Sequence, residues 1–132
     1  MQTRKPRILI VEDEKKQREL YREGLEEQGY EVIEAGDGNE AIEIMERLKK
    51  EGERLDLVVS DVSSWEKGEG IEVIGRILNH DYRIPLIIHS AYTSYKDTFL
   101  SWLADAWVNK CSDLTELKEV VRRVLEIGRA HV

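Results

Sequence analysis

The sequence predicts an α/β fold, in which a doubly wound, five-stranded parallel sheet carries five flanking helices on its two faces. Five short apolar segments are expected to form the strands: residues 7–11, 31–35, 55–60, 84–90 and 106–110. Five segments with helical spacing follow them in turn: residues 14–28, 39–50, 71–79, 94–103 and 113–127. This strict alternation predicts parallel strands joined by helical crossovers.

Two strand–helix pairs make up the first part of the chain. Residues 7–11 are almost continuously apolar, as expected of a strand buried on both faces, and the helix after them ends at Gly29. The strand at 31–35 is followed by a turn at residues 36–38, and the second helix ends before Gly52. A glycine within two residues of each helix end supports both predicted boundaries.

Three further strand–helix pairs complete the predicted fold. The strands at 55–60 and 84–90 are rich in Ile, Leu and Val, and the helix at 71–79 between them repeats isoleucine at helical spacing. In the last helix, Asp113 is expected to be the N-cap, with an acidic residue three positions later. The apolar face of this helix consists of Leu114, Leu117, Val121, Val124 and Leu125.

Length and composition restrict the class of protein. The 132 residues are expected to form one domain with its core over about residues 7–127, because two cores would each lie near the limit of stable folding. A net charge of −7 argues against direct binding of nucleic acid or of an anionic membrane. The single cysteine, Cys111, cannot form an internal disulfide, and a lone thiol fits a reducing cytoplasm. A cytoplasmic protein without a membrane partner is therefore expected.

Polar side chains gather where the predicted strands end. Right-handed crossovers place the carboxyl ends of parallel strands at one edge of the sheet, which is where such folds bind ligands. Glu12 and Asp13 follow the first strand, Asp61 follows the third, Ser90 ends the fourth and Lys110 ends the fifth. The sequence thus predicts three carboxylates, one hydroxyl and one ammonium group around a single point.

Each of these residues also has an ordinary structural explanation. Acidic residues after a strand favour a helix N-terminus, a single Asp favours a turn, and a Ser before a helix is often a cap. A single Lys near a helix start is most often solvated. These explanations are independent of one another, so the coincidence of all these groups at one edge favours a functional site.

Four segments, in chain order, closely resemble the receiver domain of two-component response regulators. They are ILIVEDE at residues 8–14, DLVVSD at 56–61, IIHSAY at 87–92 and ADAWVNK at 104–110. The resemblance extends over nearly the whole chain, from about residue 7 to residue 127. It implies the flavodoxin-like strand order 2-1-3-4-5.

The resemblance implies a magnesium site at the strand ends. Asp13 and Asp61 would ligate Mg²⁺ directly, Glu12 would act through water, and the backbone carbonyl of Ser63 would complete the protein ligands. This agrees with physical expectation, because three neighbouring carboxylates repel one another unless a divalent cation joins them, and oxygen ligands suit Mg²⁺. With Mg²⁺ and Lys110 present, the three negative charges are balanced.

The resemblance further implies that Asp61 accepts a phosphoryl group from a sensor histidine kinase or a phosphotransfer protein. The Ser90 hydroxyl and the Lys110 ammonium would hold the phosphoryl oxygens. Such a chain is not an enzyme with a separate substrate, but a phosphoacceptor that assists its own phosphorylation and dephosphorylation. In this family, Ser90 and Trp107 would form the switch.

The expected output surface comprises the helix at 94–103, the strand at 106–110 and the helix at 113–127, which would contact a downstream protein target. The sequence departs from the family pattern near this surface. Cys111 follows Lys110, where most receivers have proline, so a trans peptide bond is expected there. Trp107 stands where Tyr or Phe is typical, and its larger ring is expected to limit how far the switch side chain moves inward.

Two other function classes and one other origin compete with this hypothesis. A receiver-like binding module would keep the fold but would not be phosphorylated. A Mg²⁺-dependent hydrolase on a similar sheet would need a second acid or base beyond the acceptor, and residues 61–63 (Asp-Val-Ser) lack one. The chain is alternatively a receiver excised from a longer response regulator or from a hybrid kinase.

Overall fold

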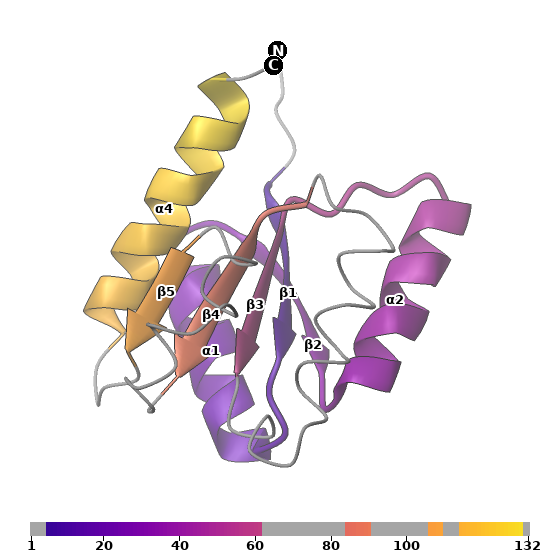
Figure 1. The fold of residues 1–132 in the computed structure, drawn as a ribbon, viewed down its shortest axis with the longest axis horizontal. Helices are drawn as coiled ribbons and strands as arrows, with labels where there is room; N and C mark the ends of the chain where they lie inside the picture. Colours follow the sequence, from indigo (N-terminus) through magenta and orange to yellow (C-terminus); the bar gives the residue numbers. More distant parts are fainter. Residues whose placement is uncertain (1–4, 62–83, 91–105, 110–113, 131–132) are drawn as a thin grey trace.

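The computed structural model describes residues 5–61, 84–90, 106–109 and 114–130, and it describes side chains for residues 5–60, 84–87 and 114–126. The strands are β1 (Arg7–Val11), β2 (Glu31–Ala35), β3 (Leu57–Asp61), β4 (Leu86–Ser90) and β5 (Ala106–Asn109). The helices of the described ranges are α1 (Lys15–Glu27), α2 (Gly38–Lys50) and α4 (Thr115–Ala130), as Figure 1 shows.

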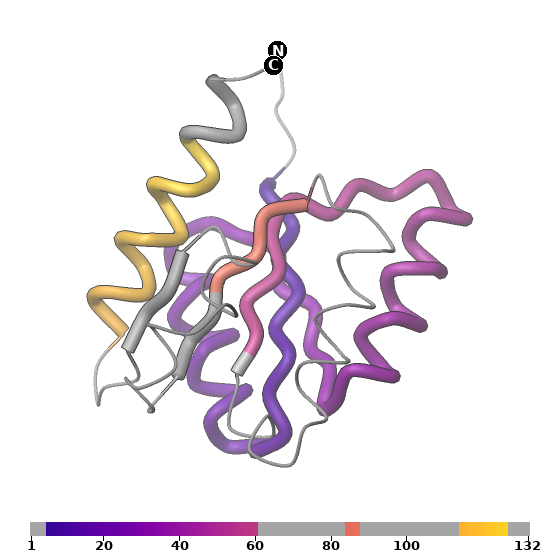
Figure 2. Tube along the Cα trace, in the orientation of Figure 1, coloured from indigo at the N-terminus to yellow at the C-terminus, as the bar shows by residue number. Residues whose placement is uncertain are grey.

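The strands form one parallel sheet with the order β2-β1-β3-β4-β5. The chain enters near the middle of the sheet, adds β2 on one side of β1, and then crosses to β3 on the other side (Figure 2). The predicted α/β fold with a parallel sheet is confirmed, and the strand order matches the one that the resemblance implies. The helices predicted at 71–79 and 94–103 lie outside the described residues.

Apolar side chains fill both faces of the sheet. One buried cluster joins Leu9, Val11, Val58 and Leu86 to the inner face of α2, which includes Ile44 and Met45. The other joins the alternate strand residues to α1 and α4: Ile8, Ile10, Leu57, Val59, Ile87, Tyr21, Leu25, Leu117, Val121 and Leu125. Figure 1 accordingly shows α2 on one side of the sheet and α1 and α4 on the other. Burial on both faces explains why these strands are almost continuously apolar.

Local chemistry explains the end of α1 and the start of α2, which lie within one residue of the predicted boundaries. Gly29 has a φ of +92°, the left-handed conformation that commonly ends a helix, and it follows Gln28, the C-cap of α1. At the start of α2, the Asp37 side chain accepts a hydrogen bond from the Glu40 N–H at 2.8 Å. The Glu40 carboxylate in turn accepts one from the Gly36 N–H at 3.0 Å. These reciprocal bonds satisfy backbone donors that have no partner within the helix.

The largest differences from the predicted boundaries lie in β3, β4 and the last helix. The strand predicted from residue 55 begins at Leu57, because Asp56 has another role: its Oδ2 accepts a hydrogen bond from the Arg7 N–H at 2.8 Å. The strand predicted from residue 84 begins at Leu86, after Pro85, which has no N–H to donate. The last helix continues beyond residue 127 to Ala130, while its expected N-cap, Asp113, lies outside the described residues.

An ionic cluster lies at the edge of the sheet where the strands begin. The Arg7 side chain is ion-paired with Glu31 and, at 3.1 Å, with Glu53, and it donates to the Arg54 carbonyl at 2.7 Å. The hydrogen bond to Glu31 raises the pKa of the Arg7 guanidinium above its ordinary value. Arg7 therefore ties β1 to β2 and to the segment that leads into β3.

Helices α1 and α4 approach each other closely at Gly24. A methyl group placed on Gly24 would lie 2.5 Å from Leu114 Cδ1 and 3.3 Å from Lys118 Cε. Lys118 also lies 3.9 Å from the carboxylate of Glu27 on α1. The two helices thus cover one face of the sheet as a closely packed pair.

Candidate functional site

The candidate site lies at the carboxyl ends of β1 and β3, the point at which the strand order reverses. Val11 pairs with Ser60 in the parallel register, so Glu12 and Asp61 follow a matched pair on neighbouring strands. Neighbouring strands lie about 4.8 Å apart, which brings the backbones of these two acidic residues close together. Ligands of open α/β sheets bind at this kind of position.

Glu12 is a buried acidic residue in this position. Its side chain is 2% exposed, and its N–H continues the sheet pairing by donating to the Ala35 carbonyl at 3.0 Å. The Glu12 carboxylate accepts a hydrogen bond from the Glu14 N–H at 3.2 Å. Burial of a carboxylate is costly unless hydrogen bonds or a cation compensate for it. The buried carboxylate of Glu12 at the ligand-binding edge therefore favours binding of a positively charged group there.

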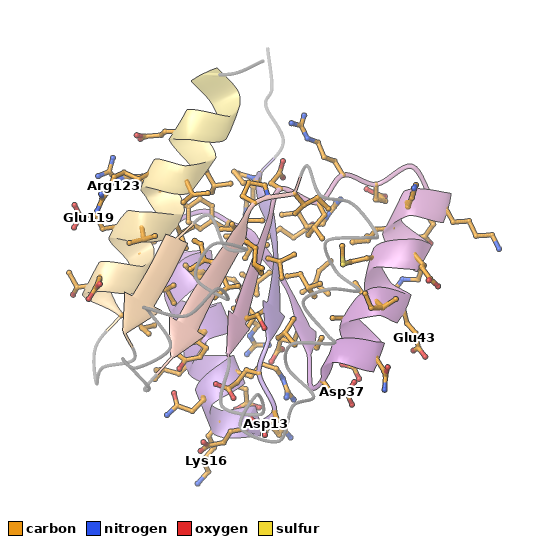
Figure 3. The ribbon with its side chains drawn as sticks, in the orientation of Figure 1. Asp13, Lys16, Asp37, Glu43, Glu119 and Arg123 are labelled. Carbon is orange, nitrogen blue, oxygen red and sulfur yellow. The ribbon has the colours of Figure 1, made fainter. Side chains whose placement is uncertain are left out.

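Asp13, by contrast, is exposed in the loop between β1 and α1. Figure 3 shows Asp13, Lys16 and Asp37 at the end of the molecule toward which the strands run. The other labelled side chains, Glu43, Glu119 and Arg123, lie farther from it, on α2 and α4. The exposed Asp13 and the buried Glu12 thus present one carboxylate to solvent and one to the interior at the same edge.

The start of α1 is unusual for a helix. Its N-cap residue, Glu14, makes no side-chain capping bond, and its first turn contains no acidic residue. Instead, Lys15 and Lys16 begin the helix, although basic side chains at this end oppose the helix dipole. Sequences often depart from local helix rules at functional positions. Here the acidic residues stand in the loop before the helix, at the candidate site.

Arg18 also belongs to this region, although the sequence pattern does not single it out. Its Nη1 donates to the backbone carbonyl of Glu12 at 2.8 Å, and its Nε donates to Glu34 Oε1 of β2 at 3.2 Å. The only signal in the sequence is another basic residue close to the start of a helix, and that signal is weak.

The remaining predicted site residues are described only in part. Asp61 and Ser90 are the last residues of β3 and β4, so their backbones lie at the same edge as Glu12. Trp107 pairs in register with Ile88 on the neighbouring strand. The structure describes only the backbones of Asp61, Ser90 and Trp107, and Ser63 and Lys110 lie outside the described residues.

The donor chemistry at this edge fits Mg²⁺. Glu12 and Asp13 supply two carboxylates from one loop, and the register brings the backbone of a third acidic residue, Asp61, next to them. Hard carboxylate and carbonyl oxygens are the ligands that Mg²⁺ prefers. The structure does not describe the Asp61 side chain. Among the side chains that it does describe, no three His, Cys, Asp or Glu residues are grouped so that they could hold a metal ion.

A family model for the response regulator receiver domain matches residues 8–122. The chain belongs to the response regulator receiver domains. The match includes the loop of Glu12 and Asp13 and the end of β3 at Asp61. The receiver domains are modules of two-component signalling systems, and the strand order observed here is that of their fold.

Curated relatives of this receiver domain are longer proteins. The alkaline phosphatase synthesis transcriptional regulatory protein PhoP of Bacillus subtilis is 33% identical over 121 residues, which are 90% of this chain and 48% of PhoP. The CAI-1 autoinducer sensor kinase/phosphatase CqsS of Vibrio cholerae is 38% identical over 93 residues, which are 68% of this chain and 13% of CqsS. The chain therefore spans about half the length of PhoP and a small part of CqsS.

Solved structures of a response regulator and of a receiver domain match this one along nearly their whole length. The response regulator protein TrrA of Thermotoga maritima, in complex with Mg²⁺-BeF, has a TM-score of 0.74 and 36% identity, and the match covers 90% of this chain and 98% of TrrA. TrrA also matches in its complex with the histidine kinase ThkA, with a TM-score of 0.74. A CheY-like receiver domain from Methanospirillum hungatei shares the fold, with a TM-score of 0.80 at 23% identity.

None of the helices in the described ranges combines the length and the apolar character that a transmembrane segment requires.

Proposed function

We propose that this receiver domain is a phosphorylation switch, which accepts a phosphoryl group from a sensor histidine kinase or a phosphotransfer protein onto Asp61. The observation that carries the proposal is the register of β1 and β3. It puts Asp61 next to the loop of Glu12 and Asp13 at the reversal point of the sheet, in a chain that belongs to the receiver family. The structure of TrrA with Mg²⁺-BeF, at 36% identity, supports the same chemistry.

In the proposed reaction, a carboxylate oxygen of Asp61 forms a bond to phosphorus while the bond between phosphorus and the donor imidazole nitrogen breaks. The leaving imidazole is neutralised by a proton from solvent, and Asp61 becomes an acyl phosphate. Phosphoryl transfer depends mostly on positioning and on neutralising charge, and so the residues around Asp61 carry the catalysis. The domain assists its own phosphorylation and acts on no separate substrate.

Glu12, Asp13, Asp61 and the Ser63 carbonyl would hold Mg²⁺ at this edge. When bound, Mg²⁺ would supply the positive charge that offsets the clustered carboxylates and the incoming phosphoryl group. The side chains of Ser90 and Lys110 would donate hydrogen bonds to the phosphoryl oxygens.

The proposed signal leaves through a protein–protein surface formed by the helix at 94–103, β5 and α4. Movement of Ser90 toward the phosphoryl group would free space next to β5, where Trp107 changes position. The complex of TrrA with the kinase ThkA supports a histidine kinase as the partner on the input side. We place this receiver domain in the cytoplasm. It would act there either as a separate protein or as part of a longer regulator or kinase such as PhoP or CqsS.

Intact mass spectrometry tests the proposal directly. After incubation with acetyl phosphate and Mg²⁺, the protein should gain the mass of one phosphoryl group, and it should gain none when EDTA removes the metal. A protein that stays unmodified at saturating donor and Mg²⁺ would instead be a receiver-like binding module.

Magnesium should also stabilise the fold, because only the folded chain brings Glu12, Asp13 and Asp61 together. At a hundredfold excess of Mg²⁺ over its dissociation constant, linkage predicts a gain of about 2.7 kcal/mol in the free energy of unfolding. Thermal unfolding with and without MgCl₂ measures this gain. Asp13→Asn should lose most of it.

Asp37→Asn is the matched control for this metal prediction. Asp37 lies at the same end of the molecule, and asparagine replaces aspartate well as an N-cap. This variant removes the same charge and should keep the full Mg²⁺ response. An equal response in Asp13→Asn and the wild-type protein would place the metal elsewhere.

A further inference from the structure

Arg18 connects the loop of the candidate site to the edge of the sheet. From α1, its Nη1 donates to the carbonyl oxygen of Glu12 at 2.8 Å, while its Nε donates to Glu34 Oε1 on β2 at 3.2 Å. The Arg18 side chain is only 19% exposed. One guanidinium therefore bonds to the metal-binding loop with one nitrogen and to the edge strand with another.

The contacts around Arg18 restrict where its guanidinium can lie. Glu34, which accepts from Arg18 with one oxygen, also accepts from Arg22 Nη1 with the other, at 3.4 Å. Gly36 lies next to the group, because a methyl group at that position would be in ordinary van der Waals contact with Arg18 Nη1, at 3.4 Å. A planar guanidinium with a charged partner on one side and little free space on the other has few orientations available.

The bond to the Glu12 carbonyl bears on both acidic residues of the loop. This carbonyl belongs to the peptide group that joins Glu12 to Asp13, and a peptide group is planar. A hydrogen bond that fixes this oxygen also fixes the plane of the peptide group. It therefore restricts the orientation of the backbone at both Glu12 and Asp13. A charge-assisted hydrogen bond is about twice as strong as one between neutral groups.

We infer that Arg18 is a positioning residue for cation binding: it holds the Glu12–Asp13 peptide so that the two carboxylates are ready to bind Mg²⁺. The inference rests on the proposed function, because it concerns the same metal site. In this role Arg18 would bind neither Mg²⁺ nor the phosphoryl group directly. It acts through the backbone of Glu12, in the way that outer-shell residues orient metal ligands.

Positioning and simple charge predict opposite effects when Arg18 is neutralised. If Arg18 acted only as a nearby positive charge, it would repel Mg²⁺, and its loss would tighten binding. If Arg18 positions the loop, its loss weakens binding by about 10–100-fold, the usual range for outer-shell residues of metal sites.

The experiment is a titration of the ¹⁵N-labelled, 132-residue protein with MgCl₂ at constant ionic strength, followed by the amide resonances of residues 12–14. Four proteins are compared: the wild type, Arg18→Gln, Arg18→Lys and Arg22→Gln. Thermal unfolding without Mg²⁺ identifies the folded variants. Arg18→Lys keeps the charge but lacks the fork that reaches two acceptors, so it should also bind Mg²⁺ more weakly than the wild type.

Arg22→Gln is the matched control. It removes the same charge from the same helix and from the same partner, Glu34, and in the described part of the chain no hydrogen bond of Arg22 to the Glu12–Asp13 loop occurs. Its Mg²⁺ affinity should stay within about twofold of the wild type, since Arg18 keeps its own bonds.

The outcomes separate this inference from the proposed function. If the wild-type protein itself binds no Mg²⁺, the proposed function fails. If the wild type binds Mg²⁺ but Arg18→Gln binds it equally or more tightly, the proposed function stands and the positioning role is wrong. Wild-type affinity in Arg18→Lys, or an equal loss in Arg22→Gln, would likewise overturn it.

Discussion

Replacing Asp61 by asparagine should abolish the Mg²⁺-dependent gain of a phosphoryl group. The carboxamide of asparagine has no negatively charged oxygen to attack phosphorus, so the acyl phosphate cannot form. Asparagine has almost the same shape as aspartate, and the end of β3 should keep its pairing with β4. Intact mass after incubation with acetyl phosphate and Mg²⁺ measures the effect, which is expected to be a complete loss.

Asp56→Asn serves as the control for this variant, because Asp56 lies just before β3, at the opposite edge of the sheet. Its Oδ2 accepts a hydrogen bond from the Arg7 N–H, and the amide oxygen of asparagine can accept the same bond. Asp56→Asn should therefore gain one phosphoryl group, as the wild type does. The same gain of mass in Asp61→Asn would show that another residue is the acceptor.

Leu25→Ala should lower the free energy of unfolding by about 2–5 kcal/mol, the usual cost of truncating a buried leucine. Leu25 is 0% exposed and packs on α1 against the face of the sheet that α4 also covers. Domains of this size are stable by only about 5–15 kcal/mol, so the loss is a large part of the total. Urea denaturation of the wild type and the variant gives the difference.

Leu20→Ala provides a matched control on the same helix. It makes the same chemical change with the same difference in helix propensity, but Leu20 is 44% exposed. Its effect should stay within about 0.5 kcal/mol, as for most surface substitutions. Similar losses in both variants would mean that helix propensity, and not burial, determines the cost.

The fold could be predicted well where the residues that flank a strand mark its ends. β1 and β2 have the predicted bounds, because their ends coincide with a change to polar residues or glycine. β3 starts later than predicted, since Asp56 bonds to Arg7, a residue 49 positions away. No local pattern of hydropathy contains that contact.

The site could be predicted in outline for a topological reason. Parallel strands bring Glu12, Asp13 and Asp61 to one edge, whatever the details of packing. Burial of Glu12 beside an exposed Asp13 is a consequence of how the loop turns, which adjacent acidic residues do not reveal. Arg18 could not be predicted, because its partner Glu34 lies 16 positions away on another strand. The roles of Ser90, Lys110 and Trp107 stay predictions.

The close contact of α1 and α4 at Gly24 matters for protein engineering. Alanine is about 1 kcal/mol better than glycine inside a helix, so a designer who seeks a more heat-resistant variant would choose this position first. Here the added methyl group would lie 2.5 Å from Leu114 Cδ1, and either this leucine must turn away or the helices must separate. Packing lost between the helices would oppose the gain in helix propensity. Redesign at position 24 should therefore treat Leu114 as part of the same site.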